Sequence, residues 1–479
     1  MKRMRWAAAG ILLLAAGSAR ANNLVVTNVV ASARDTNTAF VAFDLSWENS
    51  WRDTNVNHDA AWVFFKVRRQ GETAWTNHVV LEGTGTNPPG YAVGTGTPIE
   101  MIVPTDKVGL FVRRSQQGAG NVAVTGVKAV WNIASSGMAS ASMVEMTACA
   151  LEMVYVAEGS FEAGDGQGGR SQYTKTLINT GDPTVAPSGS PLAGGYPSGG
   201  EAYPAAAAIT TNWPNGYKAF YCMKYEITQG QYADFLNTLT SGQAATRTIQ
   251  GEADYTAYRG TIGGTWPNHT VSAPDRACGF LSWADGAAFA DWAGLRPMTE
   301  LEFEKACRGP TPAVAGEYAW GNATAPTAIT SENNDGQGTS TANPSSANCC
   351  YNNQLQGPCR AGIFATDTST REQAGASYWG IMELSGNLWE RTVTIASADD
   401  FGAFNGGRFT GLHGDGKLNG NGDASVTAWP ATDASGAVIR GGNWGRDSSY
   451  ARVSDRTFPG GETAPRYGVT GWRGVRSAP

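Results

Sequence analysis

GIMELSGNLWERT, residues 380–392, is the segment from which the fold of this chain can be inferred. Two acids, Glu383 and Glu390, flank a Ser-Gly-Asn turn within an otherwise apolar segment. Because an unpaired charge is costly to bury, each acid needs a partner if the segment lies in the core. The acids are therefore solvated or paired with arginine, act as a catalytic pair, or bind a cation.

The length of 479 residues predicts two domains. Residues 1–21 have the pattern of a signal peptide, with a basic start, a short apolar run and the small-x-small site Ala19-Arg20-Ala21. No later run approaches the ~20 apolar residues of a membrane-spanning helix. We therefore expect an exported protein without a membrane span, which is periplasmic, on the cell surface or extracellular.

The charge balance argues against some partners. Four of the 35 basic residues lie in the signal segment, which leaves 31 basic against 41 acidic residues. Such an acidic chain is not expected to bind nucleic acid or anionic lipid. The chain has seven cysteines, and export permits disulfides. Cys349, Cys350 and Cys359 lie close together in the sequence, so we predict a disulfide in this loop.

Residues 22–147 predict an all-β domain. Runs such as AFVAFDLSW and WVFFKVRR are short, aromatic and β-branched, and turn residues separate them. Alternation of Val63, Phe65 and Val67 with charged residues predicts a half-buried strand. We expect a β-sandwich of the immunoglobulin or fibronectin type III kind.

From residue 150 the chain mixes helices with short, glycine-rich elements. Thr228, Ser282 and Thr299 each precede a Gln, Asp or Glu by three residues, which predicts three capped helix starts. Gly294 and Gly309 predict the ends of the second and third helices. The whole chain is therefore expected to be α+β.

Seven segments in order resemble the family of formylglycine-generating enzymes, also called sulfatase-modifying factors. They are MVYVAEGSFEAGD (153–165), YCMKYEITQGQYADFLN (221–237), LRPMTELEFEKACRG (295–309), YAWGN (318–322), GIMELSGNLWERT (380–392), IRGGNWGRDSSYARVSDR (439–456) and GWRGVR (471–476). The resemblance covers residues 150–479. It implies a compact variant of the C-type-lectin-like fold, irregular and rich in loops.

The resemblance implies a role for the opening segment. In this family the matching stretch coordinates a structural calcium ion, which would place carboxylates at Glu383 and Glu390 and backbone carbonyls at Gly386 and Leu388. The chemistry agrees, because calcium takes six to eight oxygen ligands and a tight turn supplies carbonyls between two acids. Arginine-paired or solvated acids remain the alternative.

The family chemistry is oxidation of a sulfatase cysteine by oxygen and copper held by two cysteines. By the resemblance, Ala451 and Arg456 occupy those positions, and no cysteine follows Cys359. Soft thiolates are what copper(I) requires, so copper is not expected here. The four histidines also lack the spacing that related iron enzymes use.

The resemblance implies that the C-terminal segment lines the family's binding groove. Its candidate ligand-binding residues are Trp444, Arg446, Asp447, Tyr450, Arg452 and Arg456. Aromatic rings and arginines suit binding because they combine apolar area with directional hydrogen bonds. The alternative is that Trp444 and Arg452 are core and ion-pair residues.

Two functions follow from these observations. The first is a non-catalytic binding or surface-display module on a calcium-stabilised lectin-like fold, with an unidentified protein, peptide or glycan ligand. Variable proteins of diversity-generating retroelements use this subclass of fold for binding, which supports the hypothesis by analogy. The second is a formylglycine-generating oxidase or another metal-dependent oxidoreductase with unrecognised metal ligands.

Overall fold

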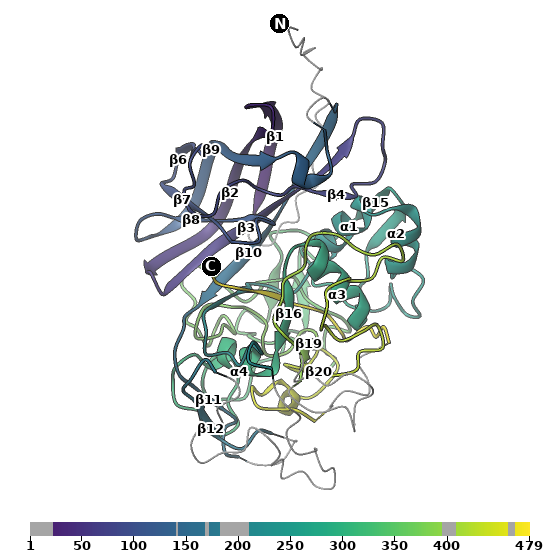
Figure 1. Cartoon of the computed structure of the whole chain (residues 1–479). Coiled ribbons are helices and arrows are strands. Elements are labelled where there is room, and N and C mark those ends of the chain that lie inside the picture. The colour runs from purple at the N-terminus through teal and green to yellow at the C-terminus, as the bar shows by residue number, and fades with distance from the viewer. Residues whose placement is uncertain (1–22, 140–141, 168–171, 183–209, 395–408, 458–464) are drawn as a thin grey trace, which may run out of the picture.

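The computed structural model describes residues 23–139, 142–167, 172–182, 210–394, 409–457 and 465–479 (Figure 1). The predicted signal segment, residues 1–21, lies outside the described residues. The described chain is α+β, as predicted, and its N-terminal part is β-structured. It is also rich in strands. None of the described helices combines the length and the apolar character needed to cross a membrane.

The N-terminal strands form two layers. One layer holds β1 (Val25–Ala33), β2 (Thr38–Thr54), β6 (Thr95–Gly96) and β9 (Gly118–Asn132). The other holds β3 (Asn57–Arg69), β4 (Asn77–His78), β5 (Gly85–Thr86), β7 (Ile99–Val103) and β8 (Leu110–Arg114). A hydrophobic cluster lies between them, with Phe43 of β2 against Phe65 of β3 at 5.5 Å between ring centroids.

Strand β3 corrects one prediction. Its alternating sequence predicted a half-buried strand, but nearly every residue of β3 is buried. Phe65 faces the N-terminal core, whereas Phe64 packs edge-on against Trp292 of the C-terminal domain at 5.0 Å. Lys66 is only 1% exposed and donates to the carbonyl oxygens of Trp292 and Gly416. The second face of the strand is therefore covered by the C-terminal domain and not by water.

Strand β10 (Val144–Val156) joins the two parts of the molecule. It pairs antiparallel with β3 over 144–154 and with β13 (Phe220–Met223) over 153–156. The boundary predicted at 147–150 thus falls within one strand. A single sheet continues from the N-terminal strands through β10 to β13, β21 (Gly474–Ser477), β16 (Arg296–Thr299), β19 (Glu390–Val393) and β20 (Ala437–Arg440).

Four helices and three small hairpins complete the described C-terminal domain. The helices are α1 (Gln229–Thr238), α2 (Ser241–Arg247), α3 (Trp283–Trp292) and α4 (Glu300–Arg308). The hairpins pair β11 (Phe161–Ala163) with β12 (Thr176–Ile178), β14 (Ile262–Thr265) with β15 (Asn268–Val271), and β17 (Ser331–Asn333) with β18 (Thr341–Asn343).

The predicted helix starts at Thr228, Ser282 and Thr299 are confirmed, because each residue caps its helix within a complete capping box. A fourth box at Thr240 begins α2, which was not predicted. Every residue of α4 is buried, including its charged residues.

The predicted loop disulfide is absent, because all seven cysteines are free thiols. Cys349, Cys350 and Cys359 are buried, and each thiol contacts an oxygen atom of a neighbouring residue: Ser385 O, Gly357 O and Asn387 Oδ1, respectively. The loop is therefore fixed by packing and hydrogen bonds.

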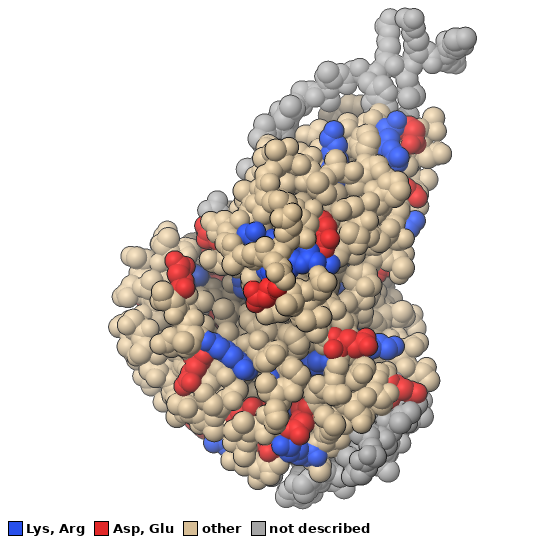
Figure 2. Space-filling view, turned by 90° about the vertical axis from the view of Figure 1, so that its left-hand side faces the viewer, with Lys and Arg blue, Asp and Glu red and all other residues tan. Residues whose placement is uncertain are grey.

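The face of the molecule shown in Figure 2 carries no single-sign charged field. Acidic and basic side chains lie next to one another there, separated by wide uncharged areas. Such a surface gives little long-range attraction for a polyanion.

Candidate functional site

The segment 380–392 forms a tight, buried turn. Glu383 and Asn387 both have positive φ, 54° and 63°, and Gly386 has φ of 87°. A Cβ atom at Gly386 would lie 2.5 Å from Cys349 Sγ and 2.6 Å from the carbonyl oxygen of Cys350. Position 386 therefore requires glycine for both its backbone conformation and the closeness of its neighbours.

A third acid, which the sequence analysis missed, fixes this turn. Glu226 is 1% exposed, accepts from the side-chain amide of Asn387, and accepts from the backbone N–H of Leu388 at 3.0 Å. Asn387 Oδ1 in turn accepts from the backbone N–H of Cys359 at 2.9 Å. Glu226 lies just before the predicted cap Thr228, but nothing in its local sequence indicated a contact with a turn so distant in the chain.

The two predicted acids have different partners. Arg473 on the segment leading into β21 donates from Nε and Nη2 to Oε1 of Glu390, at 2.8 and 2.7 Å. Glu383 Oε1 accepts from the backbone N–H of Gly362 at 2.7 Å. Glu383 is 4% exposed, and Glu390 and Arg473 are fully buried. The arginine-paired arrangement therefore holds for Glu390, whereas no basic side chain among the described residues is in direct contact with Glu383.

Burial disfavours the charged form of these acids. It raises the pKa of Glu383 to about 7, against the opposing attraction of Arg473. Burial also raises the pKa of Glu390, again opposed by Arg473. The pKa of Glu226 is raised well above its usual value by burial and by the neighbouring charge of Glu390. Arg473 attracts all three carboxyl groups and Arg360 also attracts Glu383, so the acids outnumber these two cations when all three are ionised.

The four residues that the resemblance implies as calcium ligands retain unused oxygens. Oε2 of Glu383 and Oε2 of Glu390 are buried without a hydrogen-bond partner. The carbonyls of Gly386 and Leu388 accept no hydrogen bond from the described part of the chain. No group of three or more His, Cys, Asp or Glu side chains among the described residues is placed to hold a metal ion. A cation here would therefore depend on two carboxylates and two backbone carbonyls, a hard oxygen donor set that fits calcium.

The segment 441–456, here called the C-terminal loop, lies directly on this turn. The backbone N–H of Gly386 donates to Gly441 at 2.7 Å, and that of Trp444 donates to Asn387 at 2.8 Å. The hydroxyl of Ser385 donates to the carbonyl of Ala451 at 2.7 Å. The structure therefore brings the predicted cation residues and the predicted ligand-binding segment together.

Two of the six predicted ligand-binding residues are buried beneath the surface of this loop. Trp444 is 4% exposed, donates from its indole N–H to Gly468, and packs against Tyr258. Arg456 is 3% exposed and donates through Nε and Nη2 to Glu300 of α4, at 2.6 and 2.8 Å. Their contacts make them supports of the loop, with little surface to offer a ligand.

The other four candidates reach solvent. Arg446 and Asp447 are exposed, and Tyr450 and Arg452 are half-buried. The guanidinium of Arg446 lies 5.5 Å from the ring centroid of Tyr450. Arg452 donates from Nη1 to Gln167 at 3.0 Å, and its Nε is buried without a partner. Asp447 accepts from the backbone N–H of Ser449 and so begins the short helical turn Ser448–Ala451.

The two positions implied for the family's copper ligands lie in different surroundings. Ala451 is buried in a cluster with Tyr318, Trp320 and Cys349. Arg456 is held by its ion pair with Glu300. Neither side chain supplies a soft donor, so these two positions do not fit a copper ion.

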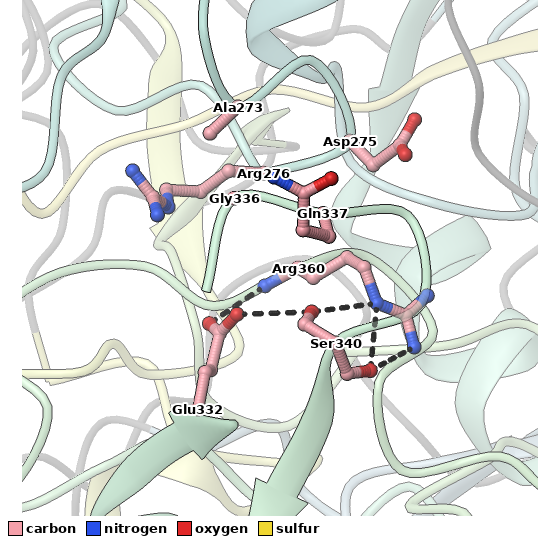
Figure 3. Close-up of a pocket in the computed structure, with 8 residues that line it drawn as sticks. All are labelled: Ala273, Asp275, Arg276, Glu332, Gly336, Gln337, Ser340 and Arg360. Atoms are coloured by element: carbon pink, nitrogen blue, oxygen red, sulfur yellow. Dashed lines mark hydrogen bonds between the residues drawn. The ribbon is translucent and has the colours of Figure 1, made fainter. Parts of the chain in front are cut away.

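A small pocket lies elsewhere, beside the β17–β18 hairpin (Figure 3). Arg360 donates from Nε and Nη2 to the carbonyl of Ser340, and Glu332 accepts from the backbone N–H of Arg360 and from the hydroxyl of Ser340. Figure 3 shows the side chain of Arg276 extending away from this group. The pocket has room for about one water molecule and includes none of the predicted site residues.

Comparisons with known proteins place these observations in a family. A formylglycine-generating enzyme of Mycobacterium tuberculosis (strain ATCC 25618 / H37Rv) is 32% identical over 114 residues, which cover 24% of this chain and 32% of that protein. The match thus spans about one third of the relative's length. The solved structure of Treponema denticola variable protein 1 aligns with 69% of this chain and 96% of its own, with 11% identity and a TM-score of 0.32.

The family comparison covers far more of the chain. The model of the sulfatase-modifying factor enzyme 1-like domain matches residues 141–478, which contain both the buried turn and the C-terminal loop. The resemblance inferred from the seven segments is thereby confirmed, and this chain belongs to the sulfatase-modifying factor family.

Proposed function

We propose that this protein is an exported, non-catalytic binding module whose contact surface is the C-terminal loop. The observation that carries the proposal is the display of Arg446, Asp447 and Tyr450 on a backbone that is hydrogen-bonded to the buried turn at Gly386 and Asn387. Loops that carry binding residues over a rigid frame are a common arrangement in binding proteins.

The chemistry of the loop supports a polar ligand with some flat apolar surface. A guanidinium next to a tyrosine ring offers directional donors and a stacking face, and Asp447 adds an acceptor. Protein, peptide and glycan ligands all present such groups. The mixed charges seen in Figure 2 and the acidic composition of the chain argue against nucleic acid.

Calcium is proposed as the structural ion beneath this surface. The buried Oε2 atoms of Glu383 and Glu390 and the carbonyls of Gly386 and Leu388, which have no hydrogen-bond partner among the described residues, support it. When bound, the ion would neutralise the excess negative charge among the buried acids and lock the turn on which the C-terminal loop rests.

The binding proposal is tested with the double variant Arg446→Ala/Tyr450→Ala on a glycan array and against a displayed peptide library. Tyr378→Ala is a matched control, since Tyr378 is 42% exposed and also lies near a guanidinium, that of Arg371. We expect the double variant to lose ligands that the native chain and the control retain. Identical binding profiles for all three proteins would refute the proposal.

Elemental analysis by plasma mass spectrometry separates the two functional hypotheses. The purified protein is dialysed without chelator before measurement. About one calcium per chain without copper or iron supports the binding module. Stoichiometric copper or iron would overturn it in favour of a metal-dependent oxidoreductase.

A further inference from the structure

Three of the four histidines lie where the N-terminal strands meet the C-terminal domain. His58 is on β3 and His78 is on β4, and both are fully buried. His413 lies between β19 and β20, and 19% of its side chain is exposed. The fourth, His269 on β15, is half-buried and bonds to Gln250. We call the contact of residues 57–114 with residues 155–479 the junction.

His58 uses one ring nitrogen as an acceptor. Nη1 of Arg113 donates to its Nε2 at 2.8 Å, and the hydroxyl of Tyr221 on β13 lies 3.1 Å from the same atom. A guanidinium has no lone pair, so it can only donate. A proton added at Nε2 would therefore face another N–H group and a positive charge. The ring also stacks on Tyr155 of β10, with centroids 4.6 Å apart.

His78 is held between two groups with fixed roles. Its Nε2 donates to the carbonyl of Val108, and Nζ of Lys66 lies 3.1 Å from its Nδ1. Lys66 also donates to the carbonyls of Trp292 and Gly416, so its three N–H groups meet three acceptors. The histidine and the lysine therefore accommodate one positive charge between them, and a second proton has no place.

His413 is fixed in the same way. Its Nε2 accepts from the backbone N–H of Ser477 on β21 at 2.9 Å, and its Nδ1 lies 3.3 Å from Oδ2 of Asp106. A backbone N–H cannot accept, so protonation at Nε2 would break this contact. Asp106 is also paired with Arg476, which places a second cation beside the imidazole.

We propose that the junction is an acid-sensitive contact, in which three histidines must remain neutral for the N-terminal strands to stay packed on the C-terminal domain. His58 accepts from Arg113 and His413 accepts from the backbone N–H of Ser477, and neither donor can reverse its role. His78 accepts from Lys66, and the two groups hold one positive charge. Acidification adds protons to those lone pairs, replaces attraction by repulsion, and loosens the junction. The proposal is independent of the binding function proposed above.

The charges around the three rings reinforce this behaviour. His58 is near Arg113 and Arg52, and Glu100 is bound to both arginines. His78 is near Lys66, Lys417 and Arg476, and the acids Asp291 and Asp415 are near Lys66. His413 is near Arg476, Arg296 and the acid Asp106. Burial and the neighbouring cations lower the pKa of His58 to about 3, and they lower the pKa of His78 and His413 as well. Among the described contacts of the three rings, a carboxylate touches His413 alone, and this is Asp106.

The lowered pKa values of the three histidines determine the sign of the pH effect. In the unfolded chain a histidine has a pKa near 6.5, whereas in the folded chain the pKa is lower. The unfolded state therefore binds protons first as the pH falls. Stability from the neutral rings is complete above pH ~6.5 and is lost as the pH falls towards their folded pKa values. Each histidine makes opening up to about tenfold easier per pH unit in this interval.

The first experiment follows the imidazole Cε1–H resonances of the native full-length chain by NMR between pH 8 and pH 4. We expect three histidines to stay neutral down to the pH at which the junction opens, and His269 to titrate on its own. Normal titration of His58, His78 or His413 near pH 6.5 in the folded protein would overturn the proposal. This experiment needs no variant, so it remains decisive even if substitutions impair folding.

The second experiment measures amide hydrogen exchange at pH 7 and pH 4.5, corrected for the intrinsic rate. Protection should fall first in β13 and β21 at the junction and persist in β2 and β9 of the outer layer. His413→Gln, whose amide can both accept and donate, should reduce the pH dependence at β21 by up to about tenfold per pH unit. His269→Gln is the matched control and should change nothing there. Equal pH dependence in the native chain and His413→Gln, or simultaneous loss of protection in all strands, would contradict the proposal.

Discussion

The interior between the two N-terminal layers and the interior around α4 are filled with different chemistry. Between the layers lie side chains such as Val41, Phe43, Leu45 and Trp47, all nearly inaccessible. Around α4 lie four glutamates and four arginines that pair with one another: Glu300, Glu302, Glu304, Glu317, Arg296, Arg308, Arg440 and Arg456. One buried region is thus filled with apolar side chains and the other with paired charges.

The difference shows what each region depends on. An apolar interior gains stability roughly in proportion to the area that it buries, so small losses have graded effects. A buried ion-pair network gains little overall, but it is sensitive to the loss of one member, which leaves its partner charged and unpaired. The region around α4 is therefore expected to be sensitive to the loss of any one member of its ion pairs.

The largest effect should come from breaking the network. Glu304 accepts from Arg440 at 2.6 Å, from Arg308 at 3.1 Å and from the backbone N–H of Gly164 at 2.7 Å. Glu304→Ala should lower the free energy of unfolding by about 3–5 kcal/mol, measured by urea denaturation. The control Glu72→Ala removes a surface pair with Arg69 and should cost less than about 1 kcal/mol. Similar losses in both variants would remove the distinction between buried and exposed pairs.

Glu383 is a buried acid outside the ion-pair network around α4, and the next prediction concerns its charge. Its folded pKa of about 7 exceeds the ordinary value of 4.5, so the folded chain holds the proton more tightly. In chelator, the stabilising contribution should be complete below pH ~4.5 and lost as the pH rises through 7, by about 3 kcal/mol. Glu383→Gln should abolish this contribution, as measured by urea unfolding at each pH.

Added calcium should reverse the effect in the native chain, because the ion favours the ionised form of Glu383. Calcium should then raise the melting temperature of the native protein at pH 7.5 and leave that of Glu383→Gln unchanged. Equal calcium responses in both proteins would contradict the proposed site.

The apolar interior should respond more gradually. Val41 is fully buried on β2, and Val41→Ala removes two carbon atoms from a packed cluster. We expect a loss of about 2 kcal/mol from transfer and cavity terms together. Thermal unfolding followed by calorimetry provides the measurement. A loss as large as that of Glu304→Ala would mean that both regions depend equally on each side chain.

The smallest effect concerns the helix caps, which occur only in the C-terminal domain among the described helices. Thr299 begins α4, and its hydroxyl accepts from the N–H of Glu302. Thr299→Ala should cost about 1 kcal/mol in urea unfolding, and Thr299→Ser should restore most of it. No rescue by serine would show that the methyl group of Thr299, and not its hydroxyl, stabilises the helix.

Interactions between residues close in the sequence could be predicted, whereas interactions between residues far apart in the sequence could not. The caps at Thr228, Ser282 and Thr299 were predictable because their partners lie three residues away. The full burial of β3 was not predictable, because Lys66 meets its acceptors more than two hundred residues later in the chain.

The candidate site shows the same limit. The family motifs indicated Glu383 and Glu390, but the arginine that pairs with Glu390 and the acid Glu226 that fixes the turn come from distant segments. For the same reason Arg456, predicted as a ligand-binding residue, instead pairs with Glu300 inside the protein. A side chain's type limits its chemistry, but its partners come from the tertiary structure.

Because β10 pairs with strands of both parts of the molecule, it limits where the molecule can be divided. A fusion or truncation made at residue 148 would cut β10 in two. In one fragment β3 would lose most of its pairing with β10, and in the other β13 would keep its pairing with β10 but lose β3 beyond it. Each fragment would present an unpaired strand edge, which invites association with other chains. The two parts are therefore not exchangeable modules, and recombination that respects the fold must keep β10 and both its neighbours together.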